Sequence, residues 1–203
     1  MTPISDPPAV GILGGTFDPI HRGHISVATQ ARSLLGLSRV LLVPSSVPPH
    51  RRATTASAHD RLRMVELAVE GTPGLEASDL EVARGGVSYT VETLQQLHRI
   101  APGGRLVLLI GADVATEVHG WRRFDEICRL ANIVVLSRAG IAPLDRHALD
   151  RAGIPASARV LELESPTISA TDLRHSLREG LPTGDALPAA VQDYIATHHL
   201  YGS

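Results

Sequence analysis

Residues 9–24 read Ala9-Val10-Gly11-Ile12-Leu13-Gly14-Gly15-Thr16-Phe17-Asp18-Pro19-Ile20-His21-Arg22-Gly23-His24. The apolar run 9–13 is bounded by proline and glycine, which is typical of a buried first strand. Beyond the second histidine, apolar residues recur at helical spacing, with Ile25, Ala28, Leu34 and Leu35 on one side. The stretch therefore predicts a strand, a glycine-rich turn and a helix, in that order.

The turn itself is suited to phosphate. The paired glycines Gly14 and Gly15 allow the backbone to approach a ligand closely. The helix that follows directs its first N–H groups and the positive end of its dipole into the same space. If His21 precedes this helix and His24 lies in its first turn, both imidazoles can face one phosphate. The sequence therefore predicts a nucleotide site here.

Two other interpretations of His21 and His24 exist. A metal pair would need further ligands, and neither a cysteine pair nor a His-Glu-x-x-His motif accompanies these histidines, so we expect no protein-bound metal. The histidines could also be ordinary residues of a helix start. The Gly-x-Gly-x-x-Gly turn of dinucleotide-binding dehydrogenases is not formed by Gly11, Gly14 and Gly15, which disfavours that class.

The pattern Gly-x-Phe-Asp-Pro-x-His-x-Gly-His resembles the signature of the nucleotidylyltransferase superfamily, whose members join a nucleotide monophosphate to a phosphorylated acceptor. Within that superfamily, most of the chain is similar to the bacterial nicotinate-nucleotide adenylyltransferases. The matching segments are, in order, Pro48-Pro49-His50-Arg51, Ser88-Tyr89-Thr90, Gly111-Ala112-Asp113, Trp121, Ser137-Arg138 and Ile168-Ser169-Ala170-Thr171-Asp172-Leu173-Arg174. Their order and spacing together make the resemblance specific.

The resemblance implies that the chain transfers the adenylyl group of ATP to nicotinate mononucleotide, forming deamido-NAD and pyrophosphate in NAD biosynthesis. The chemistry of ATP in turn implies Mg²⁺ as its companion, although no carboxylate cage for the ion is visible in the sequence. The resemblance assigns catalysis to His21, His24 and Arg174. The ATP-binding set is Gly14, Gly15, Thr16, Phe17, His21, His24, Gly111, Asp113, Arg138, Ile168, Ser169, Thr171 and Arg174. The set for nicotinate mononucleotide is Gly15, His50, Arg51, Ser88, Tyr89, Thr90 and Trp121.

Several of these residues keep a plainer alternative. Ser169 and Thr171 are common helix caps, although a helix starting near Ser169 would place Thr171 and Arg174 on one face. Asp113 could accept from a ribose hydroxyl or cap a helix. Trp121 could anchor the core or, as in the family, stack on the pyridine ring. His50 and Arg51 could contact phosphate or form a solvated basic loop.

All 19 Lys/Arg positions are arginine, so the chain has no lysine. A Walker-type lysine and a lysine Schiff base are therefore excluded. Any cationic contact with phosphate must come from arginine, histidine, a helix N-terminus or a metal. Arginine suits this role because its planar fork binds phosphate oxygens in pairs.

Along the chain, apolar strands alternate with amphipathic helices. Strands are expected at 39–44, 75–80, 105–110, 133–136 and 159–163, and helices from Ser57, from a Thr90 cap, over 120–131, from Thr171 and near Pro188. This alternation predicts an α/β fold, a Rossmann-like, doubly wound parallel sheet with helices on both faces. The site loops all follow strands, so they should meet at the carboxyl edge of the sheet. We expect a single domain over 1–203, with a helical portion from about 169 packed on it.

Composition limits the partners. A net charge of −2 gives no support for bulk nucleic-acid binding. The sequence has no run of 18 apolar residues and no signal peptide at its start, so we expect no membrane association and a cytoplasmic location. The partners are then small-molecule substrates, with a homo-oligomer left open. Rival interpretations are a pantetheine-phosphate adenylyltransferase, a cytidylyltransferase and a non-catalytic nucleotide sensor.

Overall fold

The computed structural model describes residues 8–49, 54–138 and 145–202. Within these ranges the strands form one parallel, six-stranded sheet in the order β3-β2-β1-β4-β5-β6. The strands are β1 (Ala9–Gly15), β2 (Arg39–Pro44), β3 (Leu75–Ala77), β4 (Arg105–Gly111), β5 (Asn132–Arg138) and β6 (Arg159–Leu163). The predicted doubly wound fold class is confirmed.

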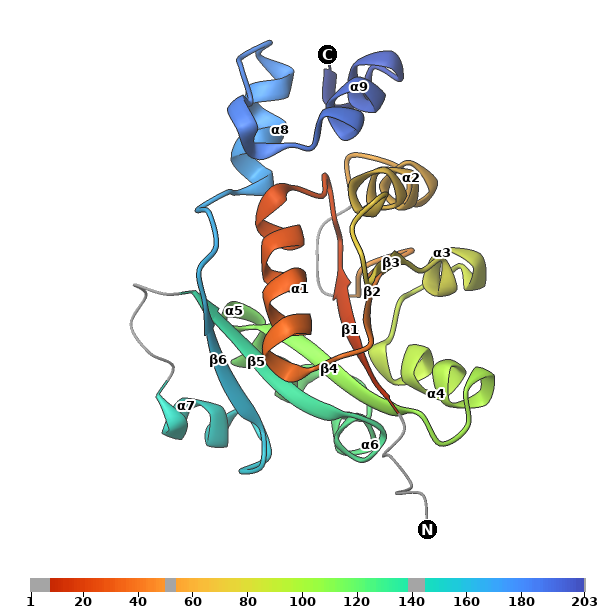
Figure 1. Cartoon of the computed structure of the whole chain (residues 1–203), viewed down its shortest axis with the longest axis vertical. Coiled ribbons are helices and arrows are strands. Elements are labelled where there is room, and N and C mark those ends of the chain that lie inside the picture. The colour runs from red at the N-terminus through yellow and green to blue at the C-terminus, as the bar shows by residue number, and fades with distance from the viewer. Residues whose placement is uncertain (1–7, 50–53, 139–144, 203) are drawn as a thin grey trace.

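Helices cover both faces of the sheet (Figure 1). They are α1 (Arg22–Leu35), α2 (Ala58–Val69), α3 (Leu80–Arg84), α4 (Thr90–Ile100), α5 (Ala112–Ala115), α6 (Phe124–Leu130), α7 (Arg146–Arg151), α8 (Ala170–Arg178) and α9 (Ala189–Thr197). Within the described ranges, the 3₁₀ turns are η1 (Val118–Gly120), η2 (Gly184–Ala186) and η3 (Leu200–Gly202). Among the described residues, no helix is both long and apolar enough to cross a membrane.

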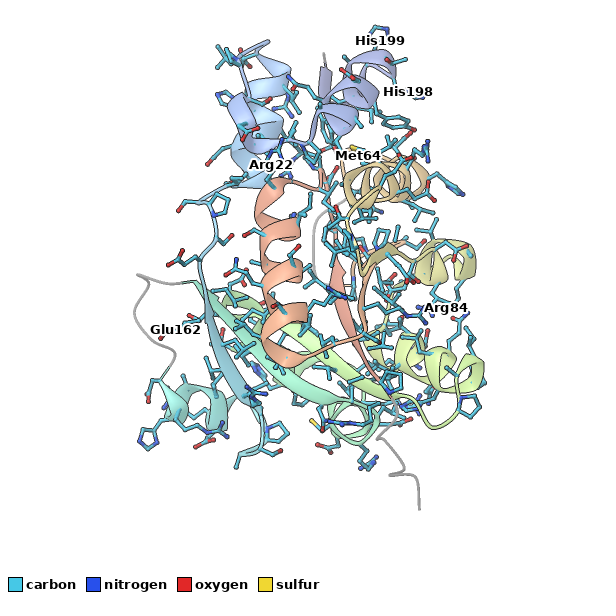
Figure 2. The ribbon with its side chains drawn as sticks, viewed as in Figure 1. Arg22, Met64, Arg84, Glu162, His198 and His199 are labelled. Atoms are coloured by element: carbon cyan, nitrogen blue, oxygen red, sulfur yellow. The ribbon has the colours of Figure 1, made fainter. Side chains whose placement is uncertain are left out.

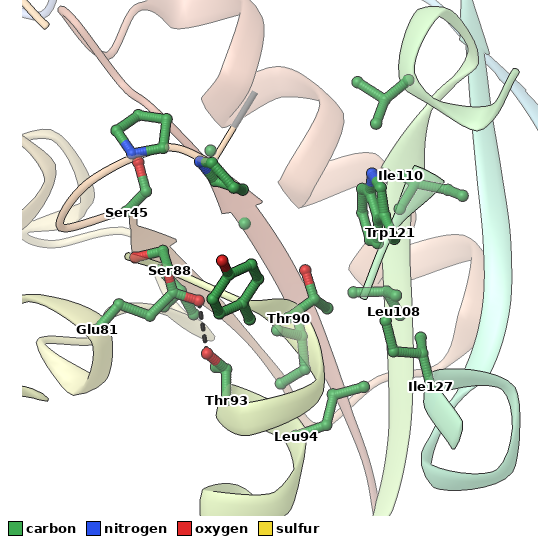
Figure 3. A pocket seen from close by; sticks show the side chains of 18 of the residues that line it. Ser45, Glu81, Ser88, Thr90, Thr93, Leu94, Leu108, Ile110, Trp121 and Ile127 are labelled. Carbon is green, nitrogen blue, oxygen red and sulfur yellow. Dashed lines mark hydrogen bonds between the residues drawn. The ribbon is translucent and has the colours of Figure 1, made fainter. Parts of the chain in front are cut away.

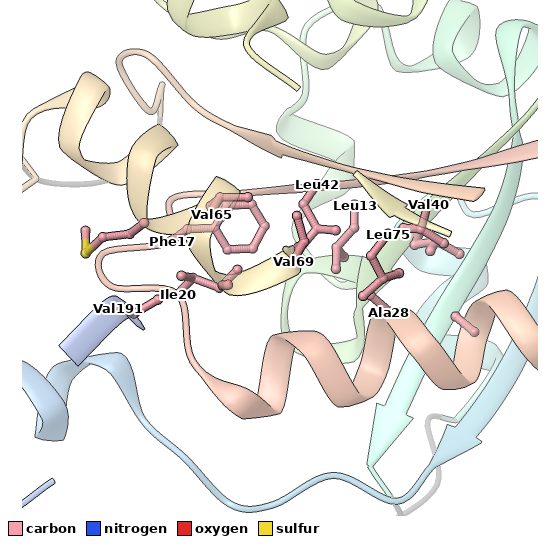
Figure 4. Packing of buried hydrophobic residues seen from close by; sticks show 14 of the residues in the cluster. Leu13, Phe17, Ile20, Ala28, Val40, Leu42, Val65, Val69, Leu75 and Val191 are labelled. Carbon is pink, nitrogen blue, oxygen red and sulfur yellow. The ribbon is translucent and has the colours of Figure 1, made fainter. Parts of the chain in front are cut away.

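Two hydrophobic clusters lie on opposite faces of the sheet because successive strand residues point to opposite sides. In β1, Leu13 belongs to the cluster that also includes buried residues of α1, α2 and the C-terminal segment, whereas Ile12 belongs to the one that includes residues of α4, α6 and α7. The first cluster also includes Phe17 and Ile20 of the loop after β1, beside Val65 of α2 (Figure 4). The glycine-rich turn is thus anchored in the core by its own apolar residues.

The chain reverses its winding between β1 and β4, which are neighbours in the sheet. In doubly wound sheets, ligands bind beyond the carboxyl ends of the strands at such a point. The loops after β1, β2 and β4 meet there. The C-terminal segment joins this edge, since α9 contacts α2 and η3 contacts α8.

The structure corrects three predicted elements. The expected strand 75–80 ends at Ala77, and the short helix α3 follows. The helix expected over 120–131 is broken: η1 ends at Gly120, Arg123 has φ 57°, and α6 begins at Phe124. Tyr89, not Thr90, is the N-cap of α4.

Candidate active site

In the loop between β1 and α1, the packing of the side chains shows what each of the paired glycines contributes. A Cβ on Gly15 would come within 2.9 Å of the Phe17 ring, whereas one on Gly14 would meet nothing within 4 Å. Gly15 is therefore needed for the packing of Phe17, which is buried and has a left-handed φ of 48°. Gly14, Gly15 and Thr16 line an adjoining cavity, so the backbone of this turn is open to a ligand.

The two histidines lie together at the start of α1, as predicted. His21 is the N-cap, and its ring stacks on that of His24 with centroids 3.7 Å apart. The backbone N–H of His21 donates to Nδ1 of His24 over 3.3 Å. A ring nitrogen that accepts a hydrogen bond carries no proton, so in this arrangement the proton of His24 is on Nε2. His24 is thereby set up as an Nε2–H donor.

Gly23 makes this stacking possible. A Cβ at that position would lie 3.0 Å from Nδ1 of His21 and 3.5 Å from the carbonyl oxygen of Pro166. A methyl group would therefore push the buried imidazole away from the helix start. The glycine between the histidines thus has a packing role as well as a place in the motif.

Arg174 and Thr171 share one face of α8, as the spacing predicted. Nη2 of Arg174 donates to Oγ1 of Thr171 over 3.2 Å, and Nη1 donates to the carbonyl oxygen of Asp18 over 2.7 Å. Ser169 caps the helix by accepting from the amide of Asp172 over 3.3 Å. The structure therefore brings the α8 start to the histidine loop across 156 residues of sequence.

The segment before α8 is held on α1 by Gln30, which the sequence did not single out. The Gln30 amide group donates to the Glu164 carbonyl oxygen and accepts from the Glu164 amide over 3.2 Å. Ser26 also donates to that carbonyl oxygen over 3.3 Å. These contacts fix where the segment leading to Ile168 and Ser169 crosses α1. Ile168 itself is half-buried against the first cluster.

A cavity of about 240 Å³ lies beside the loop (Figure 3). Figure 3 shows Trp121 and Ile110 on one side and Ser45, Ser88 and Glu81 on the other. Trp121 is half-buried and lines this space. The Trp121 ring also meets the Phe124 ring edge-on, with the two ring centroids 6.5 Å apart.

The start of α4 forms another part of the cavity wall. Tyr89 and Thr90 line the cavity, and the N–H groups of a first helical turn have no acceptor within their own helix. Ser88, also predicted as a ligand contact, is buried, and its Oγ accepts from the Ser46 amide over 2.8 Å. The guanidinium of Arg122 lies 4.7 Å from the Tyr89 ring centroid.

Buried polar groups support this wall. Thr93 of α4 donates to Glu81 of α3 over 2.5 Å, and Arg84 donates to Thr93 over 3.1 Å. These bonds join the two helices behind Ser88. The hydroxyl oxygen of Ser45 is buried, lines the cavity and has no hydrogen-bond partner among the described residues. Sequence reasoning missed Ser45, although its place after β2 could have identified it.

The remaining predicted site residues are not all at the cavity, and some lie outside the described residues. Gly111 lines the cavity and is the N-cap of α5, so the alternative of Asp113 as a helix cap is wrong. Asp113 is exposed, and a Cβ atom added at Gly111 would lie 2.5 Å from its Oδ1. His50 and Arg51 lie outside the described residues, as does the side chain of Arg138 at the end of β5.

The Cytidylyltransferase-like family model matches residues 12–176. A probable nicotinate-nucleotide adenylyltransferase of Herpetosiphon aurantiacus is 40% identical, over 95% of this chain and 98% of the relative. Another from Clavibacter michiganensis subsp. michiganensis is 35% identical over 100% and 98%. This chain belongs to the nicotinate-nucleotide adenylyltransferase family. It is a nucleotidyltransferase of that family, as the resemblance implied.

Solved structures agree on the fold. The nicotinic acid mononucleotide adenylyltransferase of Plasmodium falciparum in complex with NaAD superposes with a TM-score of 0.79, covering 96% of this chain and 97% of that one. Its sequence identity is 17%, so the likeness speaks for the fold. The doubly wound architecture is thus common to this family member and that enzyme.

Proposed function

We propose that this family member transfers the adenylyl group of ATP to nicotinate mononucleotide and releases pyrophosphate. One observation carries the proposal: the loop after β1 borders the cavity at its start and carries the histidine pair and the Arg174 contact at its end. Gly14–Thr16 line the cavity, and His21 and His24 follow at the start of α1, where Arg174 is bound to the same loop. The enzyme class itself is that of the relatives.

In the ATP half-site, His24 would donate from Nε2 to a phosphate oxygen of the nucleotide. Arg174, Thr171 and the first amides of α8 would bind the β- and γ-phosphates, because a helix N-terminus and a guanidinium both favour anions. His21, behind His24, keeps the donor in place through its backbone N–H. Gly111, Asp113 and Arg138 stay candidates for the ribose and adenine side.

The reaction needs little proton chemistry. An oxygen of the acceptor phosphate forms a bond to the α-phosphorus of ATP, and the bond from that phosphorus to the bridging β-oxygen breaks, so pyrophosphate takes the electron pair. The acceptor phosphate has a second pKa near 6 and is mostly ionised at neutral pH. The protein contributes positioning and donors aimed at the charge that develops on the transferred group.

In the acceptor half-site, Trp121 would stack on the pyridine ring and the α4 start would receive its carboxylate. The amides of Thr90 and its neighbour offer N–H donors and positive potential, which favour a carboxylate over a neutral carboxamide. Ser45 offers a further hydroxyl within the same cavity. His50 and Arg51 stay candidates for the acceptor phosphate.

Mg²⁺ would enter with ATP. Within the described ranges, no group of three or more His, Cys, Asp or Glu side chains is arranged to hold a metal. Mg²⁺ commonly keeps several waters and binds through substrate phosphates, so an ion carried by the triphosphate fits this site. It would supply charge neutralisation on the phosphates, while the histidines and Arg174 orient them.

A pyrophosphate-release assay tests the proposal. The purified chain is given ATP and Mg²⁺ with nicotinate mononucleotide or phosphopantetheine, and the product is identified by mass. We expect pyrophosphate and deamido-NAD with the first acceptor and background release with the second. The proposed reaction would be overturned if pyrophosphate were released with phosphopantetheine but not with nicotinate mononucleotide. It would also be overturned if neither acceptor raised the release above background.

A further inference from the structure

The C-terminal end of the chain reaches the phosphate loop through one buried side chain. The hydroxyl of Tyr201 donates to Oδ1 of Asp18 over 2.8 Å, across 183 residues of sequence. Tyr201 is 5% exposed and Asp18 is 6% exposed. Asp18 lies three residues before His21, in the loop that carries both histidines.

Asp18 is a hub for the loop on both its side chain and its backbone. Its carboxylate also accepts from the amides of Thr55 over 2.8 Å and Ala56 over 3.1 Å. Its carbonyl oxygen accepts from Arg174. The position of Asp18 therefore determines two things at once: where the histidine turn begins and where the Arg174 guanidinium is held.

Arg61 of α2 completes this arrangement from the other side. It is fully buried and donates to the carbonyl oxygens of Thr16 over 2.8 Å, Ser46 over 2.9 Å and Ala56 over 3.3 Å. Burial lowers the pKa of its guanidinium, and the charge of Asp18 counteracts this. A buried cation of this kind is stable only with such acceptors and a neighbouring carboxylate.

Tyr201 adopts a backbone conformation that a tyrosine rarely takes. Its φ is 67° and ψ is 8°, in the left-handed region that favours glycine. This turn directs the ring into the first hydrophobic cluster. Burial and the charge of Asp18 raise the pKa of Tyr201, so the hydroxyl stays protonated and can donate. A strained backbone conformation of this kind persists where the surrounding contacts hold it in place.

We infer that Tyr201 is a positioning residue for adenylyl transfer: through Asp18 it fixes the histidine turn and the Arg174 guanidinium in one geometry. The inference rests on the proposed function for its kinetic part. Without the hydroxyl, Oδ1 keeps the Ala56 amide but loses its tie to the C-terminal segment. The loop can then shift while the core around Phe17 and Ile20 stays packed.

The chain offers a matched control in Tyr194. Its hydroxyl donates to Oδ1 of Asp60 over 3.0 Å, so Tyr194→Phe also removes a tyrosine–aspartate hydrogen bond from the C-terminal segment. Asp60 lies in the first turn of α2 and does not belong to the loop or the cavity lining. The Arg22–Asp185 ion pair, which also ties the C-terminal segment to α1, involves neither tyrosine (Arg22 is labelled in Figure 2).

The experiment compares Tyr201→Phe with Tyr194→Phe for thermal unfolding, for kcat and KM of ATP and nicotinate mononucleotide, and for amide hydrogen exchange of residues 16–24 without substrate. A displaced loop lowers kcat about tenfold in Tyr201→Phe, since misplacement by a fraction of an ångström is costly. Tyr194→Phe keeps wild-type kcat. Exchange of residues 16–24 is faster only in Tyr201→Phe.

Equal kcat values and equal exchange in the two variants would overturn the inference, leaving Tyr201 as an anchor of the C-terminal segment. If wild type makes no pyrophosphate, the proposed function fails and the exchange comparison alone decides the positioning claim. If Tyr201→Phe does not fold, Asp18→Asn tests the role of Asp18 itself: the amide has one acceptor oxygen where the carboxylate has two, so at least one of the donors of Tyr201, Thr55 and Ala56 would face an NH₂ group. A wild-type kcat in Asp18→Asn would then overturn the inference.

Discussion

The loop after β1 and the wall of the neighbouring cavity differ in how they are held. The loop is tied by buried groups, and Arg61, His21 and Asp18 are 0%, 4% and 6% exposed. The segments that lead into the cavity wall instead carry exposed apolar side chains: Val47, which precedes Pro48, is 50% exposed, and Val87, which precedes Ser88, is 40% exposed. These two valines pair as an isolated parallel bridge beside the α4 start.

This difference in burial matches two different tasks, stabilising charge in the loop and admitting the acceptor at the cavity wall. A donor that must face developing charge gains from a fixed position, because it then needs no reorganisation during the reaction. A wall that admits and releases an acceptor needs an opening. The loop would therefore supply chemistry common to any acceptor, and the α4 start with Trp121 would select the acceptor.

The largest effect should follow from His24→Ala, which removes the Nε2–H donor. We expect kcat to fall by about two to three orders of magnitude, the scale of losing one preorganised donor, with a smaller change in KM for ATP. Initial rates of pyrophosphate release measure this, and circular dichroism confirms the fold. A variant with more than half the wild-type kcat would show that the histidine turn is only a helix start.

A smaller effect is expected from Arg174→Lys. Lysine keeps the charge but loses the paired fork, and a single ammonium cannot bond Thr171 and the Asp18 carbonyl oxygen in the same way. The kcat/KM for ATP should fall in Arg174→Lys and fall further in Arg174→Ala. Wild-type values in both variants would leave the α8 start as a plain cap.

The smallest effect concerns the outer side of α2, the helix that carries Arg61 to the loop. A hydrogen bond from Ser57 holds the pKa of Asp60 below its ordinary value. A lowered folded-state pKa stabilises the fold above the unfolded-state value and loses that contribution as pH falls through the folded value. Asp60→Asn should therefore lower Tm slightly at pH 7, and the difference from wild type should begin to shrink below about pH 4 and vanish only once the pH is below the lowered folded-state pKa.

The kinetics of Asp60→Asn provide the contrast with the loop. Since Asp60 lies outside the loop and the cavity lining, kcat should stay at the wild-type value. A gap in Tm that stays constant down to acid pH would show that the Asp60 charge does not stabilise the α2 start. The contribution is small because the side chain is partly solvated.

Periodicity and turn chemistry predicted the alternation of strands and helices, and with it the sheet and its carboxyl-edge site. They failed where elements are short or interrupted. Five residues are too few for α3 to show a helical period, and Arg123 leaves the helical conformation at φ 57° without a glycine to indicate it. The single-domain assignment over 1–203 stays a prediction.

The motifs predicted that the histidine loop and the α8 start share a site, and Arg174 bound to Asp18 agrees with this. The support behind the site was not predictable. Arg61 looks like a solvated charge on an amphipathic helix, and only the fold brings three carbonyl oxygens to it. Similarly, no local pattern indicates that Tyr201 meets Asp18. The individual site assignments stay predictions.

The division between fixed chemistry and acceptor choice is tested most directly by kcat/KM for nicotinate and nicotinamide mononucleotide at saturating ATP and Mg²⁺, in wild type and in Trp121→Ala. The amide would turn an NH₂ group toward the first amides of α4. Such a mismatch costs about 1–3 kcal/mol, so we expect wild type to prefer the acid by about one to two orders of magnitude. Trp121→Ala should lower both values and leave their ratio nearly unchanged, because stacking is common to both rings. Equal values for the two acceptors in wild type, or a preference for the amide, would contradict the account.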